Sequence, residues 1–273
     1  MLYVVATPIG NLSEFTYRAV EALKESDVVL CEDTRHSRPL LAYYGIDKPL
    51  VSYQKFNEKE RTEQVIKMLV DGKTVSLISD AGMPLISDPG STLIKSLAER
   101  NLKYTVISGP CACIDALVLS AKDTSRFCFV GFLPDKKSEK AKLIAKYASV
   151  EATLVFYSPP HDVDDDLEAL YEGLGAREIS IVREISKLHE EVIFARLGEK
   201  PEFTHKGEFV LVVEGAKEKE SELNSLSIED HIRAYIGGGM SKKEAVKAVA
   251  KDRKTAKSEI YAVAEKMKEK DNE

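Results

Sequence analysis

Short apolar segments rich in β-branched residues alternate with longer amphipathic segments over the first 110 residues, and this alternation constrains the fold more than any other feature. The short segments predict strands and the longer ones predict helices. Strands joined by helical crossovers form a mainly parallel sheet, whose ligand crevice lies beyond the carboxyl ends of the strands. The predicted strands are Leu2–Thr7, Val28–Asp33, Leu50–Tyr53, Val75–Ser79 and Tyr104–Ser108.

A second α/β region follows. The run Phe127–Pro134 and the charged stretch after it predict a domain boundary nearby. The spacing of the later strands permits antiparallel pairs, and the last of them is a near-continuous apolar run typical of a central strand. These predicted strands are Thr153–Tyr157, Glu178–Arg183, Glu191–Ala195 and Glu208–Glu214.

The last part of the chain predicts a polar linker and a small helical unit. Residues 216–225 are too poor in apolar side chains to fold alone. Ser241 and Glu244 have the spacing of a capping box, which opens a helix. One face of this helix carries Ala245, Val246, Val249 and Ala250, and Ser258–Lys268 predicts another helix.

Composition excludes several classes of protein. The 273 residues, 44% of them hydrophobic, suffice for a sizeable core. No apolar run approaches the roughly 20 residues that cross a bilayer, so we expect a cytoplasmic protein without membrane contact. The four cysteines include no C-x-x-C pair and have too few histidines nearby for a zinc set, so we expect them to be reduced and expect no metal site.

Three unusual loops follow predicted strands and should meet at one edge of the sheet. They are Thr7–Leu12, Ser79–Gly90 and Ser108–Cys113, rich in Gly, Pro and Asp. None contains a dinucleotide or P-loop glycine pattern, and no zinc-protease motif occurs. The loops lack clustered Lys or Arg, so they favour a cationic or zwitterionic ligand over a polyphosphate. We expect Asp88, just before Gly90, to cap the next helix.

Several motifs occurring in order resemble one known family. They include Leu2–Leu12, Glu32–Arg35, Ser79–Gly90, Ser108–Pro110, Gly131–Pro134, Arg183–Glu184, Lys187–Glu191 and Gly207–Phe209. Together they are similar to the ribosomal RNA small-subunit methyltransferase I group of the tetrapyrrole methylase superfamily. The resemblance covers Met1 to about Gly215 and is weaker in the last helices.

The resemblance implies two α/β domains of the tetrapyrrole methylase (class III methyltransferase) type, with S-adenosylmethionine between them, and a small C-terminal helical unit. We place the domains at residues 1–117, 118–216 and 217–273. It also implies a homodimer that methylates the ribose 2′-oxygen of a decoding-region cytidine in 16S rRNA of the small ribosomal subunit. The residues that it places in the cofactor cleft are Pro8, Asp80, Ala81, Gly82, Cys111, Ala112, Tyr157, Ser158, Glu208 and Phe209.

A ribose hydroxyl is a poor nucleophile, so a base or acceptor should take its proton. The matched motifs offer Asp33, Glu184 and His189 for this role, although local ion pairs and a solvated turn would also explain these residues. Arg35 suits phosphate contact or pairing with Asp33. Lys187 is a further candidate for RNA contact.

The stretch from Ser241 to Lys257 carries seven positive and two negative side chains, a local +5 in a chain of net charge −6. This favours contact with RNA phosphates, although a solvated lysine-rich face is an equal explanation. The candidates are Lys242, Lys243, Lys247 and Lys254. The alternative functions are C-methylation of a tetrapyrrole, against which this tail and the Glu32–Arg35 motif speak, and non-catalytic binding to the ribosome.

Overall fold

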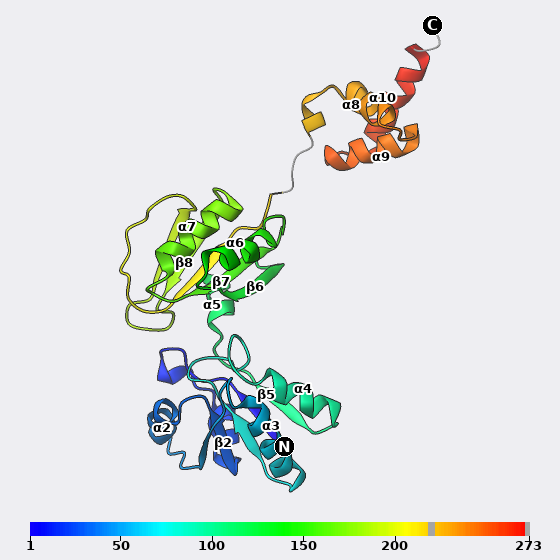
Figure 1. The fold of residues 1–273 in the computed structure, drawn as a ribbon. Helices are drawn as coiled ribbons and strands as arrows, with labels where there is room; N and C mark the ends of the chain where they lie inside the picture. The colour runs from blue at the N-terminus through cyan, green and yellow to red at the C-terminus, as the bar shows by residue number, and fades with distance from the viewer. Residues whose placement is uncertain (218–221, 271–273) are drawn as a thin grey trace. The chain divides into compact units, whose positions relative to one another are not determined.

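The structure, a computed structural model, describes residues 1–217 and 222–270. The chain divides into two compact units, Met1–Ala216 and Lys217–Glu273. The first unit contains two five-stranded sheets and the second contains the last helices (Figure 1). The expected combination of two α/β regions with C-terminal helices is therefore confirmed, whereas the division of the first unit at residue 117/118 stays a prediction.

The first sheet is entirely parallel, with the strand order β3-β2-β4-β1-β5. All five predicted strands form, each somewhat shorter than predicted. Because β4, β1 and β5 are adjacent and parallel, the loops after them leave the sheet at the same edge. The strands are β1 (Leu2–Val5), β2 (Val28–Cys31), β3 (Leu50–Ser52), β4 (Val75–Leu77) and β5 (Tyr104–Ile107).

Helices cover both faces of this sheet (Figure 1). Alternate strand residues point to opposite faces: Val28 and Leu30 pack with α3 and α4, and Val29 and Cys31 pack with α1 and α2. The chain therefore buries its apolar runs on both sides, as a parallel sheet requires. The helical segments are η1 (Leu12–Glu14), α1 (Tyr17–Glu25), α2 (Thr34–Tyr43), α3 (Glu58–Val70), α4 (Ser91–Glu99) and α5 (Ala112–Leu119).

The second sheet is mixed, with the strand order β6-β7-β10-β8-β9. Only β6 and β7 pair in parallel, and the other pairs are antiparallel. The predicted antiparallel pairs and the central position of the last strand are both confirmed. The strands are β6 (Phe127–Phe132), β7 (Thr153–Ser158), β8 (Glu178–Arg183), β9 (Glu191–Arg196) and β10 (Phe209–Val213).

Strand β6 was not among the predicted strands, and the domain boundary predicted near Phe127–Pro134 stays a prediction. The segment forms an edge strand whose register shifts between Phe129 and Gly131. Gly131 has φ +83°, a conformation that interrupts regular pairing. The strand was not predicted from the sequence because glycine and proline are both uncommon inside strands, and this segment contains Gly131 and is followed by Pro134.

Two groups of helices cover the second sheet. Helices α6 (Lys137–Ala145) and α7 (Val163–Leu174) pack on one face through residues such as Ile144 and Leu170. The other face is packed by α5, whose Ala116 and Leu117 contact Val155 and Val210. Helix α5 follows a strand of the first sheet but packs on the second, so it brings the loop after β5 to the end of β7.

The second unit is a small helical cluster. Its segments are η2 (Glu222–Ser225), α8 (Ile228–Gly237), α9 (Lys242–Asp252) and α10 (Lys257–Lys270). The predicted capping box opens α9, and the four predicted apolar residues of this helix are buried. The predicted linker includes residues 218–221, which lie outside the described residues. None of the helices in the described part of the chain has the length and apolar character needed to cross a bilayer.

Candidate functional site

The loops after β1 and β4 are hydrogen-bonded to each other. The amide of Thr7 donates to the carbonyl of Gly82 at 2.9 Å, and the amide of Gly82 donates to the carbonyl of Thr7 at 3.2 Å. Gly82 has φ +78°, and a Cβ there would lie 3.0 Å from Ile9 Cγ2. The junction of the two loops therefore requires glycine.

The loop from Ser79 to Gly90 is tightly folded beyond this junction. Leu85 and Ser87 both have positive φ, at 73° and 72°, which is costly for residues with a Cβ. The hydroxyl of Ser79 donates to the carbonyl of Gly82 at 3.1 Å. The loop is held by its own hydrogen bonds and by the bridge between Gly82 and Thr7.

The expectation that Asp88 caps α4 is wrong. The N-cap of α4 is Gly90, and the capping carboxylate comes from Glu58 on α3. Glu58 Oε1 accepts hydrogen bonds from the amides of Gly90 at 3.0 Å and Thr92 at 3.1 Å. Because Glu58 satisfies this helix end, the carboxylate of Asp88 is left to line a pocket.

A pocket of about 420 Å³ lies among these loops and the ends of β7 and β10. Nine of the ten residues predicted for the cofactor cleft line it; Pro8 does not. Its size is typical of a cofactor site. The predicted residues that line it are Asp80, Ala81, Gly82, Cys111, Ala112, Tyr157, Ser158, Glu208 and Phe209, and the others are Ile9, Met83, Ile86, Ser87, Asp88, Phe132, Pro159, Pro160 and Val210.

The pocket is acidic. Asp80, Asp88 and Glu208 line it, and none of the described lining residues is a lysine or an arginine. Burial, together with the nearby charges of Glu32 and Asp80, raises the pKa of Asp88 to about 6. Burial and Asp80 also raise the pKa of Glu32. The raised pKa values of Asp88 and Glu32 mean that these two carboxylates lack a compensating cation. A positively charged ligand would therefore be favoured near them.

Two thiols lie at the start of α5. Cys111 is the N-cap of the helix, and its Sγ lies 3.5 Å from Sγ of Cys113. Hydrogen bonding from Cys113 is the largest of the effects that lower the pKa of Cys111 to about 7. Cys113 is buried, and its pKa is raised. Of these two cysteines, the one that lines the pocket is therefore the more readily ionised.

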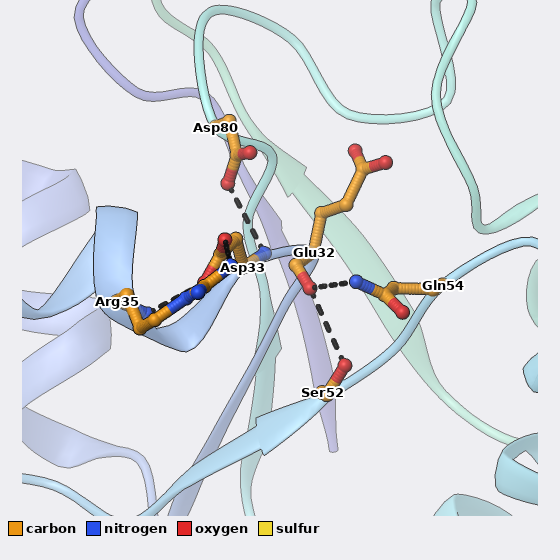
Figure 2. A network of polar contacts seen from close by, with 6 residues as sticks. All are labelled: Glu32, Asp33, Arg35, Ser52, Gln54 and Asp80. Carbon is orange, nitrogen blue, oxygen red and sulfur yellow. Dashed lines mark hydrogen bonds and ion pairs between the residues drawn. The ribbon is translucent and has the colours of Figure 1, made fainter.

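Asp33 begins α2 and is tied to Arg35 (Figure 2). The guanidinium of Arg35 donates to both carboxylate oxygens of Asp33, at 3.1 and 2.8 Å, and the Arg35 amide donates at 2.8 Å. These hydrogen bonds lower the pKa of Asp33 to about 2. The Asp33 amide donates to Asp80 at 3.3 Å, so Asp33 adjoins the pocket without lining it.

Glu184 and Lys187 form a second ion-paired group. The ammonium of Lys187 donates to Glu184 at 2.8 Å and to Glu208 at 2.9 Å. Burial acts to raise the pKa of Glu184, but hydrogen bonds from Lys187 and from the amide of Glu208 outweigh it, and the pKa is lowered. His189 is exposed in the turn before β9. Of the three predicted base candidates, Asp33 and Glu184 are ion-paired and hydrogen-bonded to residues that line the pocket, and His189 is exposed.

The chain matches the tetrapyrrole (corrin/porphyrin) methylase family over residues 1–201. Ribosomal RNA small subunit methyltransferase I of Halalkalibacterium halodurans is 42% identical over 270 residues, covering 96% of this chain and 93% of its own. The protein of the same name from Bacillus subtilis is 38% identical, covering 96% and 92%.

The chain belongs to the tetrapyrrole methylase family, within its ribosomal RNA small subunit methyltransferase I group. It is therefore a methyltransferase that requires a methyl donor. Uroporphyrin-III-C-methyltransferase of Thermus thermophilus, 20% identical with a TM-score of 0.56, covers 78% of this chain and 93% of its own. Diphthine synthase, 16% identical with a TM-score of 0.60, covers 79% and 90%. These two structures show the fold alone.

The tail of this methyltransferase presents part of the predicted basic set to solvent. Lys243, Lys247 and Lys254 are exposed. Lys242 is half-buried, and its ammonium donates to the carbonyl of Ala264 at 2.5 Å. Lys242 therefore joins α9 to α10, and its charge is less available to a phosphate than the charges of Lys243 and Lys247.

Sequence reasoning missed several residues of the methyltransferase pocket. Asp88 was assigned to a helix cap, although its position in the Asp-rich loop could have identified it. Phe132 lies at the end of β6, the strand that was not predicted. No local pattern pointed to Pro159 or Pro160, whose place in the pocket depends on where β7 ends.

Proposed function

We propose that this chain transfers a methyl group from S-adenosylmethionine to the 2′-oxygen of a cytidine ribose in the decoding region of 16S rRNA. The acidic pocket is the observation that carries the donor assignment. A sulfonium donor is a cation with an additional ammonium group. Asp80 and Asp88 supply negative charge in the pocket, where none of the described lining residues is a lysine or an arginine, whereas the third lining carboxylate, Glu208, is paired with Lys187.

The substrate assignment rests on the relatives. Proteins named as small-subunit rRNA methyltransferases match at 42% and 38% identity over almost the whole chain. The uroporphyrin methyltransferase structure is 20% identical and supports only a shared fold. Because sequence similarity extends to the C-terminal unit, we also assign RNA contact to exposed Lys243 and Lys247.

S-adenosylmethionine, when bound, would supply the methyl group of its sulfonium. The ribose oxygen would attack the methyl carbon in line with the carbon–sulfur bond, which breaks as neutral S-adenosylhomocysteine leaves, and the ribose proton would pass to an acceptor on the protein. The chain's largest contribution is therefore to hold two reactants in alignment. The hydrogen-bonded junction of Thr7 and Gly82 suits this task, and so do the pocket walls to which Tyr157 and Phe209 contribute. Asp33, Glu184 and His189 remain the proposed proton acceptors, with the ion pairs of Asp33 and Glu184 weakening both as bases.

We also propose that the protein is a homodimer. The family resemblance supports this, and so do the exposed apolar side chains of Ile114 and Val118 on α5, of which Val118 is 70% exposed. The mass of the protein in solution tests it, and a monomer at micromolar concentration would contradict it.

The function is tested with labelled S-adenosylmethionine and small ribosomal subunits from a strain that lacks the modification. We expect label in 2′-O-methylcytidine after nuclease digestion. Subunits from a strain that already carries the modification provide the matched control and should accept little label. Label that appears only in a tetrapyrrole or in protein would contradict the proposal.

A further inference from the structure

Two cysteines that the proposed methyl transfer does not use lie in contact at the start of α5. Sγ of Cys111 is 3.5 Å from Sγ of Cys113, and both are free thiols. Cys111 is partly exposed and lines the pocket, whereas Cys113 is only 4% exposed. The fold therefore holds a partly exposed cysteine against a buried one at the wall of the pocket.

Packing explains only one of these cysteines. A buried cysteine behaves as a small apolar residue, and Cys113 lies in an apolar cluster with Ala116 and Val155. Cys111 lies at the edge of this cluster, as the N-cap of α5, and its side chain does not cap the helix. The amide of Cys111 donates to Asp115 Oδ2 at 3.2 Å. Neither capping nor core packing therefore accounts for a second thiol beside Cys113.

The first turn of α5 favours the ionised form of Cys111. Hydrogen bonding from Cys113 is the largest of the causes that lower the pKa of Cys111 to about 7, and the amides of Ile114 and Cys113 act in the same direction. Burial and the charge of Asp115 oppose them. The thiolate is the form that attacks a peroxide, and oxidation selects cysteines that ionise readily and are accessible. Cys111 therefore suits this attack better than buried Cys113, whose pKa is raised.

We propose that Cys111 and Cys113 form a peroxide-sensitive pair whose disulfide weakens ligand binding in the pocket. The Cys111 thiolate attacks the outer oxygen of a hydroperoxide, the O–O bond breaks, and an alcohol, or water from hydrogen peroxide, leaves with a proton from solvent. Cys111 is then a sulfenic acid. The sulfur of Cys113 attacks the sulfur of Cys111, the S–S bond forms, and the hydroxyl leaves as water with the Cys113 proton. The two thiols lose two electrons, and the hydroperoxide gains them.

The new bond would displace part of the pocket wall. The sulfur atoms of a disulfide are about 2.05 Å apart, so the two Sγ atoms must approach each other by about 1.5 Å. Cys113 is packed in the interior, where side chains have little room to move. The movement therefore falls mainly on Cys111 and the adjoining Ala112, which both line the pocket. Tyr157, another lining residue, packs in the same cluster as Cys113.

The chemistry is tested on the full chain, reduced and then treated with hydrogen peroxide at about pH 8.5, where an ordinary thiol is also partly ionised. Tryptic peptide 104–122 contains both cysteines of the pair and neither Cys31 nor Cys128. We expect this peptide to lose the mass of two hydrogen atoms and to regain it with dithiothreitol. Cys113→Ser should not lose this mass and should form a dimedone adduct at Cys111. The matched control, Cys128→Ser, should behave as the wild type.

Two results would overturn the pair. One is a wild-type protein in which Cys111 proceeds to sulfinic acid without forming the disulfide. The other is oxidation of Cys128 before Cys111. Loss of the two hydrogen atoms in Cys113→Ser would also contradict the proposal, because the bond would then join Cys111 to a group other than Cys113.

The effect on the pocket is measured by calorimetry with S-adenosylhomocysteine, and this part rests on the proposed function. The oxidised protein should bind about tenfold more weakly than the reduced protein, the effect of one hydrogen bond lost to a displaced wall, and dithiothreitol should restore the affinity. Unaltered affinity in the oxidised protein would overturn the effect on the pocket. If the reduced protein does not bind S-adenosylhomocysteine, the proposed function fails together with this effect, whereas formation of the disulfide is decided by the peptide masses alone.

Discussion

At the residue scale, Gly82 has both a backbone role and a place in the pocket. It bridges to Thr7 with a positive φ, and it lines the pocket. Gly45 also has a positive φ, +65°, but nothing lies within 4 Å of the Cβ that an alanine would place there. The two glycines therefore separate the cost of backbone strain from an effect on the ligand.

Both Gly82→Ala and Gly45→Ala should lower the free energy of unfolding by about 1 kcal/mol or somewhat more, because alanine is strained at positive φ. Only Gly82→Ala should also weaken binding of S-adenosylmethionine, since its Cβ would press on Ile9, which lines the pocket. Thermal melts and calorimetry measure the two effects. Wild-type affinity in Gly82→Ala would show that this loop does not form the donor site.

The raised pKa of Asp88 predicts that both the stability of the protein and its affinity for a cationic ligand depend on pH. Its pKa of about 6 in the folded protein lies above the value near 4 of an unfolded aspartate. Folding therefore disfavours the ionised form, and this residue lowers the free energy of unfolding as pH rises from about 4 to 6. A cationic ligand favours the ionised form, so its affinity should increase as pH rises through 6 and level off above it.

The dissociation constant of S-adenosylmethionine should rise by up to about tenfold from pH 7.5 to pH 5, as the ionised fraction of Asp88 falls. Asp88→Asn should remove most of this dependence, and at pH 7.5 it should melt at a higher temperature than the wild type. S-adenosylhomocysteine lacks the sulfonium charge and should show a weaker dependence. An unchanged pH profile in Asp88→Asn would mean that another group titrates.

At the scale of elements, the strands of the first sheet could be predicted from the sequence, but the residues that line the pocket could be predicted only in part. Buried β-branched runs and regular crossovers made the five parallel strands predictable. Strand β6 was missed because Gly131 interrupts its pattern and Pro134 closely follows its end. The cap of α4 was misassigned because its partner, Glu58, lies 32 residues away from Gly90, and no local pattern reveals a contact over that separation.

Helix α5 brings the thiol of Cys111 to the pocket, and the reactivity of this thiol can be measured. Cys111 at its start has a pKa of about 7, whereas burial is the largest cause of the raised pKa of Cys31. Iodoacetamide should modify Cys111 faster than Cys31 or Cys113, at a rate that increases with pH around 7. Peptide mass spectrometry identifies the modified residue.

Modification of the thiols is then compared with and without a bound ligand. Saturating S-adenosylhomocysteine should slow modification of Cys111, because Cys111 lines the pocket. Cys128, which does not line it, should react at the same rate with and without the ligand. Equal protection of both thiols would indicate a general tightening of the protein instead of occupation of this site.

At the scale of the whole molecule, two regions of opposite charge lie in different units. The pocket of the first unit is acidic, and α9 of the second presents exposed lysines. The sequence alone predicted the basic stretch and its helices. It could not distinguish Lys242, whose ammonium contacts the carbonyl of Ala264, from the exposed lysines, because that contact depends on how α9 packs against α10.

Because we assign donor binding to the first unit and RNA contact to the second, substitutions in the second unit should affect RNA binding alone. K243E/K247E should weaken binding to small ribosomal subunits and leave affinity for S-adenosylmethionine unchanged. If both lysines contact phosphates, the slope of log affinity against log salt should become shallower by about 1.4 to 1.8, since each contact releases counterions. The control K59E/K67E makes the same change of charge on exposed positions of α3 and should leave the slope unaltered. A similar loss in both variants would assign the effect to net charge and not to α9, because long-range attraction to RNA does not distinguish one exposed lysine from another.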